Sequence, residues 1–398
     1  MHQILNTLYV MTQKAYLHLD HETLKVKIES ETKLQVPLLH LGAIFCFGNV
    51  SVSPFLLHRC ADDGRSLVFL EESGRFKARL AGPVTGNVLL RSAQHVASSV
   101  AGRPLAISRH IVAGKLQNAR QILLRGARED ANAEDAAKLQ GAAEHLAGLL
   151  PRIAAMDNLD QLRGLEGDGA RAYFDVFDLM IKEDRERFAM SGRNRRPPRD
   201  RINALLSFLY TMLLNDCVSA AEGVGLDPQV GFLHVLRPGR PALGLDLMEE
   251  LRCVVADRLA LTLVNRRQVG ADDFDDRAGG SVYLNDTGRK AVVAAYQKRS
   301  RMKFSIRFWG KRSRSACCRT FRPGCWPGTC ATIWRVTHRF CTGKGRGPWN
   351  CSCRTTFRRR NRKDGDDCER WRSSVSISVS GCKNRCSSAR FPRWITRN

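Results

Sequence analysis

The sequence predicts an α+β protein: a small N-terminal β-sandwich-like domain, residues 1–92, followed by an all-α domain, residues 93–299. Apolar and polar residues alternate near the N-terminus, which is typical of half-buried strands. From about Val96 the apolar residues recur at intervals of three and four, which is typical of amphipathic helices. Residues 300–398 contain no leucine, so we predict a disordered tail and not a third domain.

The strands of residues 1–92 are predicted from three apolar stretches. "AYLHLDHETLKVKIES" alternates from Ala15, and "DHET" interrupts it as a turn. "AIFCFG" and "SLVFLEESGRFKARL" continue the pattern, with "EESGR" as a hairpin turn. We interpret Ser53-Pro54 as a bend within the same β-structure. Short strands at this spacing favour a sandwich or a barrel.

The helices are predicted from segments rich in alanine and leucine with apolar residues three and four apart. The segment 202–225 is long and apolar enough to be a central buried helix. "SGRNRRPPRDR" precedes it and contains five arginines and a proline pair, which predicts an exposed loop. The four predicted helical segments are 133–150, 170–181, 202–225 and 245–267.

The charge is unevenly distributed. The chain carries a formal charge of +25, which suggests a nucleic-acid partner, but residues 301–398 hold 20 arginines and 5 lysines against 4 acids. The same residues hold 10 of the 14 cysteines. The remaining thiols are scattered, no signal peptide is visible, and no run reaches the ~20 apolar residues of a membrane span. We therefore predict a soluble, cytoplasmic protein without a membrane partner.

A histidine and several carboxylates form a candidate metal site. His234 precedes a tight "RPGRP" turn, and Asp246 and Glu249 follow it three residues apart, on one face of a helix. Glu166 lies upstream among glycines 164, 167 and 169, which permit close approach. This mixed nitrogen and oxygen set suits Mn²⁺ or Mg²⁺. The alternative is that the carboxylates are solvated and the histidine is a core residue.

Arginines beside such a site indicate phosphodiester chemistry. Arg237 and Arg240 flank the turn and are candidates for holding phosphates. The arginine-rich loop is a second candidate, since it contains more positive charge than an ordinary solvated face. The arginines that we select in this loop are Arg193, Arg195, Arg196 and Arg199.

Several long motifs resemble one known family. "GLEGDGARAYF", "RRPPRDRINALLSFLYTMLLNDC", "AEGVGLDPQVGFLHVLRPGRPALGLDLMEELR" and "LNDTGRKAVVAAYQKR" are similar to the CRISPR-associated integrase, the endonuclease subunit that inserts new spacers. The resemblance covers nearly all of residues 1–299, includes "GNVLLRSAQ", and is closest to subtype I-C.

The resemblance implies a role for each candidate residue. Glu166, His234 and Glu249 would coordinate Mn²⁺ or Mg²⁺, and Asp246 would support or join them. The reaction would transfer a 3′-hydroxyl onto a phosphodiester of a CRISPR repeat, in the cytoplasm of a prokaryote. The implied partners are double-stranded and branched DNA, a second copy bound through the β-domain, and a small ferredoxin-like protein.

The resemblance ends after Arg299. Residues 300–307 are "SRMKFSIR". When suitable codons for this stretch are read from one base earlier, they encode "KQDEIQHP", which is similar to the family's continuation. The same offset converts residues 351–372 into a sequence similar to the start of the small partner protein. Our hypothesis is that residues 300–398 are translated out of frame.

Other interpretations remain open. The cysteines of the tail contain no CxxC pair, which disfavours a zinc module, whereas a basic arm that binds DNA non-specifically is physically expected. For the whole chain, the alternatives are a branched-DNA repair nuclease and a DNA-binding scaffold whose catalysis is impaired by the altered C-terminus.

Overall fold

The computed structural model describes residues 6–82, 88–190, 192–194 and 197–300, and the fold is given for these ranges. The predicted tail, residues 300–398, lies outside them apart from Ser300, which ends the last helix.

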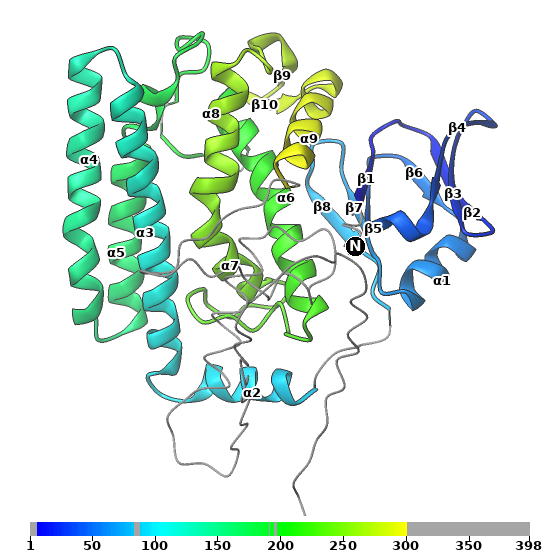
Figure 1. The fold of residues 1–398 in the computed structure, drawn as a ribbon, viewed down its shortest axis with the longest axis horizontal. Helices are drawn as coiled ribbons and strands as arrows, with labels where there is room; N and C mark the ends of the chain where they lie inside the picture. The colour runs from blue at the N-terminus through cyan, green and yellow to red at the C-terminus, as the bar shows by residue number, and fades with distance from the viewer. Residues whose placement is uncertain (1–5, 83–87, 191, 195–196, 301–398) are drawn as a thin grey trace, which may run out of the picture. The chain divides into compact units, whose positions relative to one another are not determined.

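Eight strands of the N-terminal region form two four-stranded sheets, which confirms the sandwich-like prediction (Figure 1). Both sheets contain parallel pairs, which the alternation could not reveal because alternation does not report strand direction. The first sheet has the order β1 (Asn6–Val10), β5 (Leu41–Phe47), β7 (Ser66–Leu70) and β8 (Phe76–Arg79). The second has the order β4 (Glu31–Pro37), β3 (Thr23–Ile28), β2 (Ala15–Asp20) and β6 (Val50–Val52).

Strand β5, in the interior of the first sheet, is buried on both faces. Ile44 and Cys46 of β5 belong to the core between the two sheets, whereas Phe45 and Phe47 belong to the core of the helical region. Successive side chains of a strand point to opposite faces, so a strand between two cores is a continuous apolar run. The prediction that "AIFCFG" continues the alternating pattern is therefore wrong in detail: the run is a strand, but it is apolar on both faces.

The two predicted hairpin turns are confirmed, but one strand prediction is wrong. Asp20 pairs with Thr23 across "DHET", and β7 pairs with β8 across "EESGR". Ser53-Pro54 is not a bend in a strand: it starts helix α1, Pro54–Asp62. The Ser53 side chain accepts a hydrogen bond from the Leu56 N–H, and proline fits the first helical position, so the local residues favour a helix start.

Eight further helices follow (Figure 1). The boundary placed between residues 92 and 93 falls inside the first of them. The all-α prediction missed an antiparallel hairpin, β9 (Phe274–Arg277) with β10 (Ser281–Leu284). The helices are α2 (Val88–Ser99), α3 (Arg103–Glu129), α4 (Ala133–Arg152), α5 (Leu159–Phe174), α6 (Arg201–Gly223), α7 (Ala242–Arg252), α8 (Arg258–Asn265) and α9 (Asp286–Ser300).

Two of the predicted helical segments are interrupted. The segment 170–181 ends as α-helix at Phe174 and continues as the 3₁₀ turn Phe177–Met180. The segment 245–267 is divided by the π-helical turn Cys253–Asp257, which changes the register between α7 and α8. Such turns are frequent at functional sites, and this one directly follows the helix that carries the predicted carboxylates.

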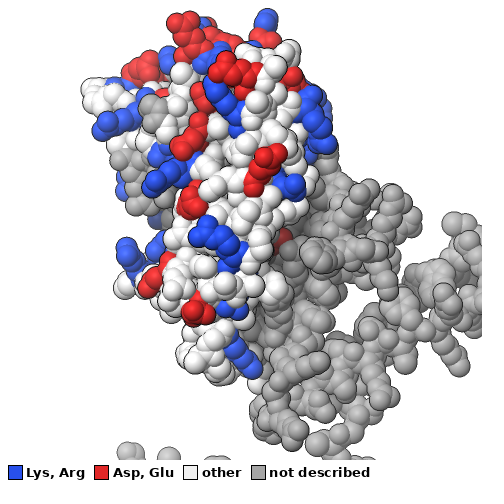
Figure 2. All heavy atoms as spheres, turned by 90° about the vertical axis from the view of Figure 1, so that its left-hand side faces the viewer, with Lys and Arg blue, Asp and Glu red and all other residues white. Residues whose placement is uncertain are grey.

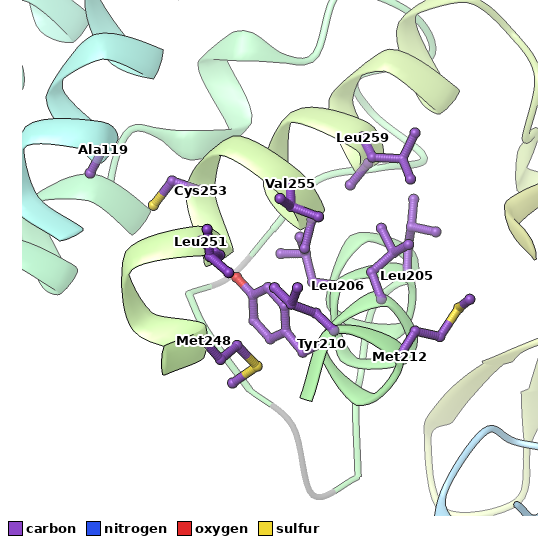
Figure 3. Packing of buried hydrophobic residues seen from close by; sticks show 14 of the residues in the cluster. Ala119, Leu205, Leu206, Tyr210, Met212, Met248, Leu251, Cys253, Val255 and Leu259 are labelled. Carbon is purple, nitrogen blue, oxygen red and sulfur yellow. The ribbon is translucent and has the colours of Figure 1, made fainter. Parts of the chain in front are cut away.

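Helix α6 is the predicted central helix. Its length and composition would allow it to cross a membrane, but 67% of its most apolar window is buried inside the protein, as in a core helix. Leu205, Leu206 and Tyr210 of α6 pack against residues of α7, the π-helical turn and α8 (Figure 3). A buried core helix can be as apolar as a membrane-spanning helix, because little of its surface is exposed to solvent.

Candidate metal centre

The loop before α7 is held by one buried carboxylate. Asp246 is fully buried, and its Oδ2 accepts hydrogen bonds from the backbone N–H groups of Phe232 (2.6 Å) and Leu233 (3.0 Å). Its Oδ1 accepts from the N–H of His234 at 3.0 Å and lies 2.7 Å from His234 Nδ1. Four contacts thus fix both the loop and the imidazole.

The backbone of the loop can approach Asp246 only because residue 231 is glycine. A Cβ at Gly231 would lie 2.7 Å from the backbone carbon of Ala242 and 2.8 Å from Asp246 Oδ2. The predicted turn is also present, since Arg240 N–H donates to Arg237 O at 3.1 Å and Gly239 has a φ of 70°. Glycine adopts this left-handed conformation without steric cost.

The geometry selects the tautomer of His234. A carboxylate only accepts hydrogen bonds, so Nδ1 carries the proton and Nε2 of the neutral ring keeps its lone pair. Nε2 lies 3.9 Å from Glu249 Oε1. A carboxylate on Nδ1 with a free Nε2 is the arrangement found behind most metal-binding histidines.

A buried lysine joins the two predicted glutamates. Lys115 of α3 is ion-paired with Glu166 Oε1 of α5 and lies 2.6 Å from Glu249 Oε2 of α7. Arg252 donates to the other oxygen, Glu249 Oε1, at 2.6 Å. Lys115 therefore lies between the two predicted glutamates, and His234 Nε2 lies 3.9 Å from one of them, Glu249.

The charges of this cluster are mutually stabilised. Burial opposes the ionised form of Glu249, but the charges of Arg252 and Lys115 lower its pKa to about 2. Burial also opposes the charge of Lys115, but Glu249 and Glu166 outweigh it and raise its pKa. Both groups are therefore charged at neutral pH.

The donors fit a hard divalent cation, but not in their present arrangement. Across the described residues, no three carboxylate, imidazole or thiol groups stand close enough together to hold a metal ion. Glu249 Oε2 is buried and, within the same residues, has only an ion-pair contact without hydrogen-bond geometry. This oxygen faces the Lys115 ammonium in the structure, although two carboxylates with one imidazole are donors that suit Mn²⁺ or Mg²⁺.

Sequence reasoning missed Lys115, Arg252, Tyr210 and Asp257. The guanidinium carbons of Arg252 and Arg193 lie over the Tyr210 ring, 4.8 and 5.2 Å from its centroid. The Tyr210 hydroxyl donates to the buried Asp257 Oδ1 at 2.6 Å. Figure 3 shows this ring pointing from α6 toward Leu251 of α7. Only Arg252 had a signal, because it continues the three-residue spacing of Asp246 and Glu249.

The predicted arginines differ in their surroundings. Arg193 points inward: besides lying over Tyr210, it donates to Asn203 Oδ1. This corrects the prediction that the whole loop is exposed. Arg199 and Arg237 are exposed and Arg240 is half-buried. Arg195 and Arg196 lie outside the described residues.

The glycines around Glu166 also differ. A Cβ at Gly164 or Gly167 would meet no described atom within 4 Å, so packing does not require glycine there. A Cβ at Gly169 would lie 2.4 Å from Leu116 Cδ2, so this glycine permits the close packing of α5 on α3. Of these three glycines, only Gly169 permits the predicted close approach, and the groups that approach each other there are helices α5 and α3.

Comparison with known proteins identifies the family. The family model described as "CRISPR associated protein Cas1" matches residues 8–298. The chain belongs to the Cas1 family. A CRISPR-associated endonuclease Cas1 of Moorella thermoacetica is 58% identical over 299 residues, which are 75% of this chain and 87% of the relative. A second Cas1 endonuclease, from Rhodospirillum rubrum, is 48% identical over 305 residues, 76% of this chain and 88% of the relative.

Solved structures confirm the Cas1 fold. A Cas1 protein from Thermotoga maritima superimposes with a TM-score of 0.70 at 23% identity, covering 86% of this chain and 99% of that protein. A casposase bound to its integration product gives a TM-score of 0.68 at 18% identity, covering 84% and 90%. The predicted order, N-terminal strands followed by a helical region, is that of the Cas1 fold.

Proposed function

We propose that this Cas1 chain is a divalent-metal-dependent DNA endonuclease and integrase that inserts new spacers into a CRISPR array. The observation that carries the proposal is that Glu166 and Glu249, from separate helices, both contact Lys115, while His234 Nε2 lies 3.9 Å from Glu249 Oε1. The near relatives are named CRISPR-associated endonucleases, and this supports the same reaction here.

In this proposal Glu166, His234 and Glu249 hold Mn²⁺ or Mg²⁺, and Asp246 positions His234 through its four contacts. The bound metal would polarise a phosphoryl oxygen and stabilise the charge that develops during in-line displacement. Arg252 keeps Glu249 ionised and oriented. Exposed Arg237, at the end of the histidine loop, and Arg240 bind the phosphates of the incoming strand.

DNA, a second copy of the chain and a small ferredoxin-like protein are the proposed partners. Support for DNA and a Cas partner comes from structural neighbours named as a Cas6-RT-Cas1–Cas2 complex and as a casposase bound to integration product. We place the protein in the prokaryotic cytoplasm, where buried thiols such as those of Cys46, Cys60 and Cys253 stay reduced. Acidic and basic side chains are mixed over the face shown in Figure 2, so we place the DNA contact at the arginines near His234.

We also propose that residues 300–398 are an out-of-frame translation and that the chain derives from subtype I-C. The family model stops at residue 298, one residue before the resemblance ends in the sequence. The tail itself lies outside the described residues. A frame restored after Arg299 would replace the arginine- and cysteine-rich tail with the family's own C-terminal segment.

The test is Mn²⁺-dependent strand transfer of a short duplex onto a repeat-bearing plasmid, with the small partner protein added. We expect the chain with the restored frame to join DNA, and EDTA to abolish the product. Joining by the present chain as well would show that residues 1–299 suffice and that the tail is passive. Failure of both chains would contradict the proposed function. Equal joining to plasmids without a repeat would instead favour the branched-DNA nuclease.

The DNA interface gives a separate prediction. Arg237→Ala and Arg240→Ala are each expected to weaken DNA binding several-fold and to reduce the slope of log affinity against log salt by about 0.9, the value for one lost phosphate contact. Arg193→Ala is the matched control: its side chain packs on Tyr210, so we expect lower thermal stability with an unchanged salt slope. Binding titrations at several salt concentrations measure the slope. A reduced slope for Arg193→Ala alone would place the DNA at the other arginine loop.

A further inference from the structure

Lys115 is the one residue of the cluster for which the proposed metal site supplies no role. Its side chain is 7% exposed, yet it carries a full positive charge. Burying an ammonium group is costly unless it is paired, so its position is determined by its two carboxylate partners. These partners are the two glutamates that we propose as metal ligands, Glu166 and Glu249.

The ammonium contacts the carboxylate oxygen that a metal ion would use. Arg252 and His234 both face Glu249 Oε1, at 2.6 and 3.9 Å. Glu249 Oε2 faces Lys115 Nζ at 2.6 Å, within contact distance for an ion pair. The same Nζ contacts Glu166 Oε1. A divalent ion bound to both carboxylates would need this position, and two cations cannot share it.

We propose that the Lys115 ammonium is an internal counter-cation that keeps Glu166 and Glu249 together before metal binds and that a divalent metal ion must displace. This inference rests on the proposed function, because it takes the two glutamates as ligands. The lysine comes from α3, whereas the glutamates are on α5 and α7. Its charge therefore offsets the repulsion between the carboxylates of these two helices.

Displacement has a physical route. Glu166 and His234 retain 24% and 20% side-chain exposure, so an ion can reach the cluster from solvent while Glu249 is buried behind them. Arg252 stays on Glu249 Oε1 and keeps part of the compensating charge when the lysine leaves. The free energy of metal binding is then the intrinsic free energy of binding to the ligands, made less favourable by the free energy that removal of the lysine costs.

Lys115→Met removes the charge and retains an unbranched side chain of similar length. We expect Mn²⁺ to bind this variant at least about tenfold more tightly than the parent chain in calorimetric titration, since its competing cation is gone. In EDTA the variant should melt at a lower temperature than the parent, and saturating Mn²⁺ should restore more of its stability. Lys115→Arg retains the charge and should leave the Mn²⁺ affinity near that of the parent.

Lys182→Met is the matched control, because Lys182 forms an ion pair with Asp130. We expect it to lower stability equally in EDTA and Mn²⁺ and to leave Mn²⁺ affinity unchanged. Equal or weaker Mn²⁺ binding by Lys115→Met would overturn the inference while the metal site stands. Absence of Mn²⁺ binding in both the parent chain and Lys115→Met would overturn the proposed function as well.

A second measurement uses the unaltered chain and does not depend on the folding of a variant. Acetylation of lysines by an amine-reactive ester, followed by peptide mass spectrometry, reports whether each ammonium is accessible. Lys115 should be protected in EDTA and should react several-fold faster in Mn²⁺, whereas Lys182 should react at the same rate in both. An unchanged or slower reaction of Lys115 in Mn²⁺ would contradict displacement.

Discussion

Replacing His234 by alanine is expected to lower Mn²⁺-dependent strand transfer by about 10³-fold or more, because a metal that polarises a phosphoryl oxygen contributes several kcal/mol and each 1.4 kcal/mol is tenfold in rate. The imidazole is the only nitrogen donor proposed for the metal, and its Nε2 is aimed at the cluster by Asp246. Single-turnover strand transfer with a labelled duplex measures the effect. DNA affinity, measured by gel shift, should change by no more than about twofold, since phosphate contacts carry most of it.

His145→Ala is the matched control for this variant. His145 lies on α4, is 46% exposed, and its Nε2 contacts only a surface carboxylate, Asp168, at 3.3 Å. We expect its strand transfer to equal that of the parent chain. If His234→Ala retained activity within about tenfold, or if it lost DNA binding in parallel, the histidine would be a core residue and the metal centre would have to lie elsewhere.

Asp246→Ala is expected to cause the largest loss of stability, about 3–5 kcal/mol, because each buried donor left without an acceptor costs about 1–3 kcal/mol. The three backbone N–H groups of Phe232, Leu233 and His234 would lose their carboxylate at once. Urea unfolding followed by circular dichroism measures the free energy of unfolding. The loop would also lose its hold on the imidazole, so activity should fall even at temperatures where the variant is folded.

Asp160→Ala provides the comparison. Asp160 lies in the first turn of α5, its side chain is 90% exposed, and its ion pair with Arg163 is on the surface. Surface substitutions of this kind change stability by no more than about 0.5 kcal/mol. A loss of similar size for Asp246→Ala would show that the loop finds other acceptors and that Asp246 is not its anchor.

Local sequence patterns predicted most elements because those patterns record burial. Alternation located β2 and β3, and the apolar segment of α6 predicted a central buried helix. Errors arose where local chemistry and pattern pointed to different structures. Ser53 and Pro54 form a helix start inside a β-rich region, and the hairpin of β9 and β10 lies inside a helical one. Neither is long enough to produce a periodic signal.

In the candidate site, too, the residues that lie close together in the sequence were predicted from local patterns, and the others were not. His234, Asp246 and Glu249 could be selected because they lie within one short stretch, and their proximity follows from a turn and a helix. Glu166 lies in a different helix, and the resemblance to a family supplied its role. The inward orientation of Arg193 depends on the Tyr210 ring, which belongs to α6 and not to the arginine loop.

The sequence by itself determined that a strand-rich region precedes a helix-rich one, the family, and the histidine and carboxylates of the candidate site, because these are recorded in local spacing and in motifs. Only the tertiary structure decided what surrounds them. It placed Lys115 from α3 between Glu166 and Glu249, and it engaged both oxygens of Asp246 in hydrogen bonds with the histidine loop. Burial and charge pairing depend on helices that are distant in sequence, and no local pattern specifies which buried cation meets which carboxylate.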